Sequence, residues 1–174
     1  MGRPWHPRVS THRQSTRLRG HDYSGPGAYF ITICALSHLF GRVRTGEVFL
    51  SPFGEIAHEC WAEIPDHFPH VRLDAFVVMP DHLHGILILA DRALRTRAIG
   101  KISPGSLGAV VRSFKSAVTA RINSLGDVRR EGIWQRNYFD QIIRGRADLD
   151  RVRWYVADNP SRWGRKRQGI MTAR

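Results

Sequence analysis

The chain has few cysteines and no long hydrophobic run. Its two cysteines, Cys34 and Cys60, lie far apart and form no CxxC pair, which argues against a zinc finger and a disulfide framework. No apolar stretch approaches the ~20 residues of a membrane-spanning helix, and no charged start followed by an apolar block resembles a signal peptide. These absences predict a cytoplasmic protein with reduced core thiols and no membrane partner.

Acidic residues are absent from both ends of the chain. Residues 1–21 hold five arginines and residues 161–174 hold four arginines and a lysine, in both cases without an acid, and the whole chain carries a net charge of +12. A clustered arginine excess is typical of nucleic-acid-binding proteins, although a solvated basic surface also explains it. An anionic membrane surface is the weaker alternative. We therefore expect a nucleic-acid partner and a nucleoid-associated protein.

Length and composition predict one domain. A chain of 174 residues with 42% hydrophobic residues is long enough for one proper core and too short for two comfortable ones. We predict a basic N-terminal arm over 1–22, a single domain over 23–164 and a basic tail over 165–174. The chain has no internal repeat.

Apolar periodicity predicts the order strand, hairpin, helix, strand, strand, helix, strand, helix. We expect strands over 28–36, 72–80, 82–89 and 132–144, a tight turn at Thr45-Gly46, and helices over 52–64, 106–125 and 147–159. Pro160 disfavours a helical conformation at Asn159, so the last helix should end there. This order favours an α+β fold, with one antiparallel sheet covered by helices on at least one side.

Two histidines stand one residue apart at the start of the apolar run HLHGILIL. On a strand, His82 and His84 project to the same face together with Ile86 and Ile88. Two neutral imidazoles side by side can hold adjacent coordination positions of one divalent ion. The pair alone is a weak signal, because each ring can equally bond to backbone or solvent at the end of a strand.

A tyrosine and an asparagine stand four residues apart in the last predicted helix. Tyr155 and Asn159 are therefore neighbours on one helical face. One interpretation is a core-edge tyrosine whose hydroxyl stays in water. The other is a phenol that attacks a phosphate ester while Asn159 offers its carbonyl oxygen to a metal. Asp158 is a less well placed ligand, because it leans to another part of the helix surface.

Four segments in order resemble the REP-associated tyrosine transposases (RAYTs), which are HUH single-tyrosine transposases. The segments are QSTRLRGHDYSGPGAYFITIC, FVVMPDHLHGI, IWQRNYFDQIIR and YVADNPSRWG, and they span residues 14–164. The resemblance implies a ferredoxin-like or RRM-like antiparallel sheet with packed helices, the HUH endonuclease fold. It also implies that His82, His84 and Asn159 bind Mg²⁺ or Mn²⁺. Tyr155 would be the nucleophile in preference to Tyr138, since it precedes the NP proline by five residues.

The resemblance further implies an activity. We expect a metal-dependent DNA endonuclease and strand transferase that cleaves single-stranded or hairpin DNA, of the REP palindrome type, through a covalent 5′-phosphotyrosine. The alternatives are a sequence-specific nucleic-acid-binding protein that does not cleave, and a metallohydrolase that uses metal-bound water. No obligate protein partner is evident, and monomer and homodimer both stay open.

Basic and aromatic side chains are candidates for DNA contacts. Phosphate binding is expected of Arg13, Arg17, Arg19, Arg112, Lys115, Arg165, Lys166 and Arg167. Trp5, Trp134 or Trp163 could stack on bases, with core packing favoured for Trp134.

Overall fold

The computed structural model describes residues 18, 20–91, 105–126 and 132–169, with the backbone alone for 164–169. Its elements in chain order are β1 (Gly27–Cys34), β2 (Gly41–Arg44), β3 (Glu47–Leu50), α1 (Pro52–Ala62), α2 (Ile64–His67), β4 (Val71–Val78), β5 (His82–Leu89), α3 (Leu107–Ser124), β6 (Phe139–Ile143) and α4 (Arg146–Gly169).

Four of the strands form one antiparallel sheet in the order β4-β5-β1-β6. In the chain, α1 lies between β1 and β4, and α3 lies between β5 and β6, which is the β-α-β-β-α-β pattern of a ferredoxin-like fold. The prediction of an α+β fold with an antiparallel sheet and packed helices is confirmed. The strand that carries both histidines, β5, is central in this sheet, so its backbone is hydrogen-bonded on both sides.

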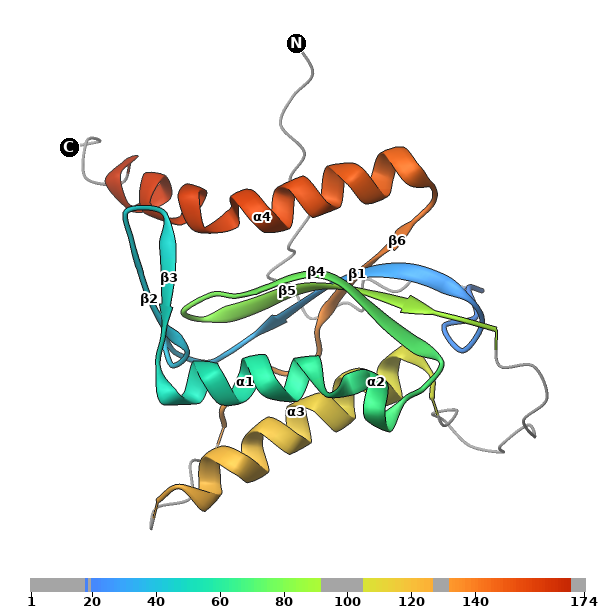
Figure 1. Cartoon of the computed structure of the whole chain (residues 1–174), viewed down its shortest axis with the longest axis horizontal. Helices are drawn as coiled ribbons and strands as arrows, with labels where there is room; N and C mark the ends of the chain where they lie inside the picture. Colours follow the sequence, from blue (N-terminus) through green and yellow to red (C-terminus); the bar gives the residue numbers. More distant parts are fainter. Residues whose placement is uncertain (1–17, 19, 92–104, 127–131, 170–174) are drawn as a thin grey trace.

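Helices cover both faces of the sheet. Figure 1 shows α1, α2 and α3 below the sheet and α4 crossing above it. Side chains of β5 alternate between these layers: Leu83 and Leu87 pack with the α1 and α3 side, whereas Ile86 and Ile88 pack with α4. The alternation expected from the sequence is confirmed, and it leaves His82 and His84 on the α4 side.

The hairpin β2–β3 stands beside the C-terminal half of α4 (Figure 1). Its turn is the predicted Thr45-Gly46 pair, with φ of 50° and 81°. Both residues have positive φ, as the two central residues of a type I′ hairpin turn require. Gly46 lies against Ser161 of α4, where an added Cβ would come within 3.3 Å of the serine hydroxyl oxygen. The hairpin therefore gives α4 a second contact beyond the main sheet.

The predicted strand over 132–144 is wrong in its first half. Only Phe139–Ile143 form β6, and Trp134 makes one isolated bridge to Ala35. Gly132 and Asn137 have φ of 78° and 69°, and such left-handed residues interrupt an extended chain. The segment before β6 is consequently a loop that runs along the end of β1.

The prediction that the last helix ends at Asn159 is also wrong, because α4 continues through Pro160 to Gly169. A proline inside a helix removes one hydrogen bond and crowds the preceding turn. Across this point, Arg162 donates from Nε to the carboxylate of Asp158, one turn earlier. That ion pair and the contacts of α4 with β2 and β3 support the extra turns. The helix therefore also runs past residue 164, where the domain was expected to end, into the range 165–174 that was predicted as a tail.

In the parts of the chain that the structure describes, every helix is too short or too polar to span a membrane.

Gly85 sits between His84 and Ile86 and lies directly against Trp61, which is fully buried. A Cβ on residue 85 would lie 2.3 Å from Cζ2 of the indole, so the strand or the ring must shift. We expect Gly85→Ala to lower the free energy of unfolding by about 1–3 kcal/mol, measured by urea denaturation. Gly126→Ala is the matched control, since nothing lies within 4 Å of its added Cβ. Equal stability of the two variants would contradict the contact.

Candidate active site

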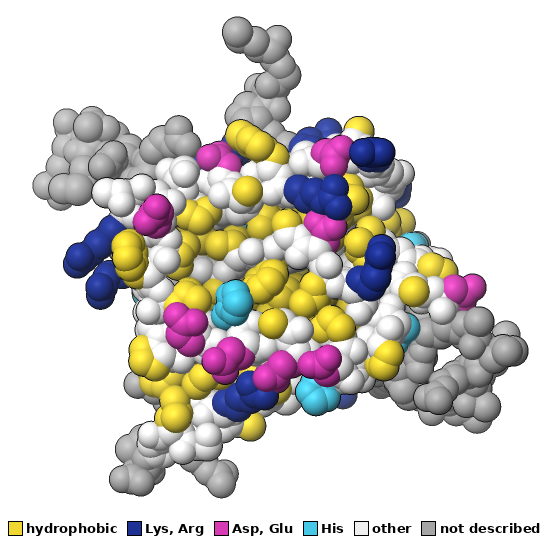
Figure 2. Space-filling view, in the orientation of Figure 1, with side chains coloured by type: hydrophobic (Ala, Val, Ile, Leu, Met, Phe, Trp, Pro, Cys, Tyr) yellow, Lys and Arg dark blue, Asp and Glu magenta, His cyan; other side chains and the backbone are white. Residues whose placement is uncertain are grey.

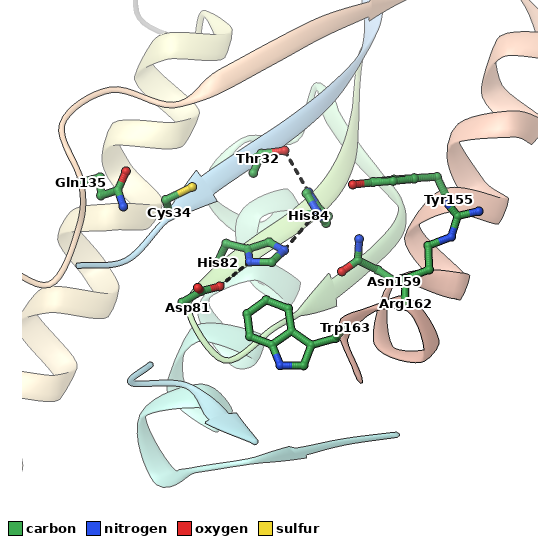
Figure 3. A pocket seen from close by; sticks show the side chains of 10 residues that line it. All are labelled: Thr32, Cys34, Asp81, His82, His84, Gln135, Tyr155, Asn159, Arg162 and Trp163. Carbon is green, nitrogen blue, oxygen red and sulfur yellow. Dashed lines mark hydrogen bonds and ion pairs between the residues drawn. The ribbon is translucent and has the colours of Figure 1, made fainter. Parts of the chain in front are cut away.

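A pocket of about 290 Å³ lies between the sheet and α4 (Figure 3). The sheet side contributes Thr32, Cys34, Asp81, His82 and His84; α4 contributes Tyr155, Asn159, Arg162 and Trp163; and the loop before β6 contributes Gln135. The pocket thus joins the histidine pair to the tyrosine and asparagine of the last helix, as the sequence predicted.

Strand pairing arranges the sheet side of the pocket. In the register of β1 and β5, Thr32 stands opposite His84 and Cys34 stands opposite His82. His84 is only 3% exposed, and its Nδ1 lies 2.8 Å from the hydroxyl oxygen of Thr32. The backbone ladder and this hydrogen bond together hold the buried ring in one orientation.

His82 is held by the acid that precedes it. Its Nδ1 lies 2.6 Å from Oδ1 of Asp81. Burial raises the pKa of Asp81, but the hydrogen bond from His82 and the charges of His82 and His38 outweigh it, so the pKa lies below the usual value. An ionised carboxylate only accepts hydrogen bonds, so Nδ1 of His82 is the donor, and in a neutral imidazole of this tautomer the lone pair is on Nε2.

The two histidines face each other through their Nε2 atoms, which are 3.1 Å apart. Two nitrogens that bind one ion at about 2.1 Å and at right angles are themselves separated by about 3.0 Å. In the structure one Nε2 donates to the other; with an ion in place of that proton and with Thr32 accepting from Nδ1 of His84, both Nε2 atoms would offer a lone pair to the same position. The spacing and the hydrogen bonds behind the rings therefore fit two neighbouring ligands of one octahedral ion.

A complete metal site needs more than these two rings. Among the described residues, no group of three His, Cys, Asp or Glu side chains is arranged to hold a metal ion. Figure 3 shows the amide of Asn159 on the α4 side of the pocket, next to Tyr155 and facing the histidine pair. An amide oxygen and water are ligands that hard ions such as Mg²⁺ accept, so Asn159 suits the third position.

Tyr155 is a buried phenol at the inner end of the pocket, 8% exposed. Its ring centroid lies 5.3 Å from that of His84 and 5.8 Å from that of Phe30. Burial raises the pKa of Tyr155, and the hydrogen bond from Asn159 and the charge of Arg162 offset that effect only in part. The phenol is therefore protonated at neutral pH.

Several pocket residues were missed by sequence reasoning. Thr32, Cys34 and Gln135 come from segments distant in sequence, and no local pattern marks them. The prediction of a core thiol suits the buried Cys60 but is wrong for Cys34, which is partly exposed in the pocket. Arg162 follows Tyr155 by seven residues, a helical spacing that was hidden because the helix was expected to end at Asn159.

The two predicted phosphate-binding residues whose side chains the structure describes lie away from the pocket. Arg112 and Lys115 lie on α3, on the other side of the sheet, and Lys115 donates to the carbonyl oxygens of Gln135 and Asn137 at 2.8 and 3.2 Å. Arg13, Arg17 and Arg19 lie outside the described residues, as do the side chains of Arg165, Lys166 and Arg167. Their contacts with DNA stay predictions.

An ion pair links α4 to the edge strand β4. Nε and Nη2 of Arg153 lie 2.8 and 2.7 Å from the two carboxylate oxygens of Asp74. The hydrogen bonds from Arg153 are the largest cause that holds the pKa of Asp74 below its usual value. Arg153 stands two residues before Tyr155, so this pair helps to set where the phenol lies.

Comparison with known proteins points to one family. No family model matches the chain. An uncharacterised protein of Haemophilus influenzae is 36% identical over 164 residues, which cover 87% of this chain and 90% of that protein. A second protein of Haemophilus influenzae, named as a REP-associated tyrosine transposase, is 24% identical over 147 residues, 82% of this chain and 75% of that protein.

Among solved structures, a REP-associated tyrosine transposase bound to a REP hairpin has the same fold. It aligns with a TM-score of 0.61 at 19% identity, covering 86% of this chain and 75% of that one. This chain is a RAYT-like protein. It belongs to the same family as the first Haemophilus protein, and the fold that the four sequence segments implied is the fold observed.

The Arg153–Asp74 pair predicts a pH-dependent contribution to stability. Because the folded-state pKa of Asp74 is lowered, the contribution is fully present above the unfolded value near 3.9 and is lost as the pH falls through the folded pKa. We expect Asp74→Asn to cost about 1 kcal/mol at pH 7 and less at each step below about pH 4, measured by urea denaturation. Asp91→Asn, an exposed acid without an ion pair to any described residue, should have no such effect. A pH-independent difference for Asp74→Asn would contradict the pair.

Proposed function

We propose that this RAYT-like protein is a metal-dependent DNA endonuclease and strand transferase whose nucleophile is Tyr155. The observation that carries the proposal is the meeting of Tyr155 with the histidine pair in one pocket, with 5.3 Å between the ring centroids of Tyr155 and His84. A buried phenol beside two converging imidazoles is typical of a functional site, because a purely structural core is stabilised by apolar side chains.

The comparisons and the charge support DNA as the substrate. The solved RAYT is bound to a REP hairpin, so we propose single-stranded or hairpin DNA of the REP palindrome type for this chain too. The net charge of +12 favours a polyanion. Figure 2 shows acidic side chains in a row along α1 and α2, which repels phosphate from that face. The DNA would therefore approach from the α4 side.

His82, His84 and Asn159 would hold Mg²⁺ or Mn²⁺. The bound ion would neutralise charge on the non-bridging phosphate oxygens and polarise the phosphorus. Asp81 and Thr32 would orient the two imidazoles from behind, as carboxylate and hydroxyl partners of metal-binding histidines do.

Tyr155 would form the covalent bond. Its phenolic oxygen attacks phosphorus, the bond from phosphorus to the 3′ oxygen breaks, and the proton that the phenol loses balances the proton that the leaving oxygen gains. The 5′ phosphate stays on Tyr155 and a 3′ hydroxyl is released. Because the new phosphodiester keeps the energy of the old one, a second 3′ hydroxyl can reverse the step and complete strand transfer.

A covalent adduct tests the nucleophile. We expect the protein to form a denaturation-resistant adduct in Mn²⁺ with hairpins that carry randomised single-stranded flanks. Each hairpin is labelled at its 5′ or its 3′ end. Only the 3′ label should stay on the protein, because the fragment bound through its 5′ phosphate carries the 3′ end. Tyr155→Phe should abolish the adduct on a denaturing gel, whereas Tyr138→Phe should retain it. Cleavage without an adduct would indicate attack by water, and DNA binding without cleavage in the parent protein would indicate a non-cleaving binder.

Metal binding is testable without DNA. We expect Mn²⁺ affinity, measured by calorimetric titration, to fall by at least about tenfold in His84→Ala and by about tenfold in Thr32→Val, which removes the hydroxyl partner of His84. His58→Ala is the control, since His58 is exposed on α1 outside the pocket. Unchanged affinity in both His84→Ala and Asn159→Ala would remove the proposed site.

A further inference from the structure

The chain has five tryptophans, and the structure separates them by role. Trp61 is buried in the hydrophobic core and Trp134 packs against it, which confirms the packing role expected of Trp134. Trp5 lies outside the described residues. Trp154 and Trp163 belong to neither hydrophobic cluster of the described residues, and of these two only Trp163 lines the pocket.

The ring of Trp163 forms one wall of the pocket. Its centroid lies 5.6 Å from that of His82 with a tilt of 40° (Figure 3). It also lies 5.8 Å from the ring centroid of His38, at 72°. The side chain is half-buried, so part of the indole stays accessible. A large aromatic side chain has thus been placed beside a proposed metal ligand, where it adds little to the core.

The extension of α4 past Pro160 creates this position. Tyr155, Asn159 and Trp163 stand at successive four-residue steps, so they share one helical face. At 1.5 Å per residue, Trp163 lies about 6 Å along the helix from Asn159 and about 12 Å from Tyr155. The nucleophile, the third metal ligand and the indole therefore form one row that faces the histidines.

We propose that Trp163 is the stacking surface for an unpaired nucleobase of the DNA strand whose phosphate enters the pocket. Bases stack on aromatic side chains in single-strand binding sites, with an alanine cost of about 1–3 kcal/mol per base. A base within a duplex has both faces covered by its neighbours, so this contact requires a base that is free of the stack. The inference rests on the proposed function and names the residue that selects single-stranded DNA.

Arg162, the residue before Trp163, supplies a positive charge for the phosphates of the DNA strand. Among the described residues that line the pocket, Arg162 is the only arginine or lysine. Its Nε donates to Asp158 and its guanidinium stacks 4.6 Å from the ring of Trp154, so the cation is held in place. A fixed cation beside an accessible aromatic face is the combination with which proteins hold single strands: one binds phosphate and the other binds the base.

The test compares DNA with and without bases. In the Tyr155→Phe background and without divalent metal, fluorescence anisotropy measures affinity for a fluorescein-labelled hairpin with a single-stranded flank. A second probe has abasic residues throughout the flank, so its phosphates remain. With Trp163 present, we expect the bases to improve affinity by at least about fivefold, the lower end of the stacking range.

The variants separate stacking from packing. Trp163→Phe should keep most of the preference for the base-containing probe, because a phenyl ring also stacks. Trp163→Ala and Trp163→Leu should lose it, although leucine still fills space. Trp154→Ala is the matched variant: it removes an indole that is 60% exposed and does not line the pocket, and the loss of its contact with Arg162 acts on the phosphates of both probes alike. That variant should keep the preference.

Two outcomes would overturn the inference: an equal preference in Trp163→Ala and the parent, or a Trp163→Leu variant that behaves like Trp163→Phe. The second outcome would assign Trp163 to packing against His82. Failure of the proposed function would be seen separately, as the absence of a covalent adduct. The binding comparison uses a protein without the nucleophile, so its result does not depend on cleavage.

Discussion

The antiparallel pairing of β5 with β1 is the constraint on which the rest of this structure depends. It places Thr32 opposite His84 and Cys34 opposite His82, and a shift of one residue would turn both histidines toward α1 and α3. The register is held by apolar side chains on both faces, with Leu83 and Leu87 on one side and Ile86 on the other. Burial of these side chains therefore determines where the imidazoles point.

The second requirement is that α4 crosses the same face. Val152 and Val156 pack against Phe30 and Ile86, and this apolar contact brings Tyr155 over His84. The hydrogen bonds of Arg153 to Asp74 attach α4 to β4, an edge strand of the sheet. Because packing and an ion pair both position α4, the phenol, the amide and the indole line the pocket from one face of this helix.

Much of this arrangement could be predicted from local patterns. The alternation in HLHGILIL placed both histidines on one face, and the four-residue spacing of Tyr155 and Asn159 placed them together on a helix. The failures have a common cause. Pro160 argued for a helix end on local propensity, but contacts of α4 with the β2–β3 hairpin and the Asp158–Arg162 pair outweigh that local cost. The alternating apolar residues after Gly132 suggested a strand, but left-handed residues make most of that segment a loop.

The sequence by itself determined the order of elements, the α+β class and the two faces of β5, because each of these follows from the spacing of apolar residues over short segments. It also determined the resemblance to RAYTs, because that depends on four short contiguous segments. Only the tertiary structure decided which residues surround the histidines. Thr32 lies beside His84 because β1 pairs with β5, and Gln135 lies in the loop before β6. Trp163 lies in the part of α4 that follows Pro160. Packing between segments distant in the sequence determines these neighbours. Its free energy exceeds local conformational preferences, and it produces no periodic pattern that sequence analysis could detect.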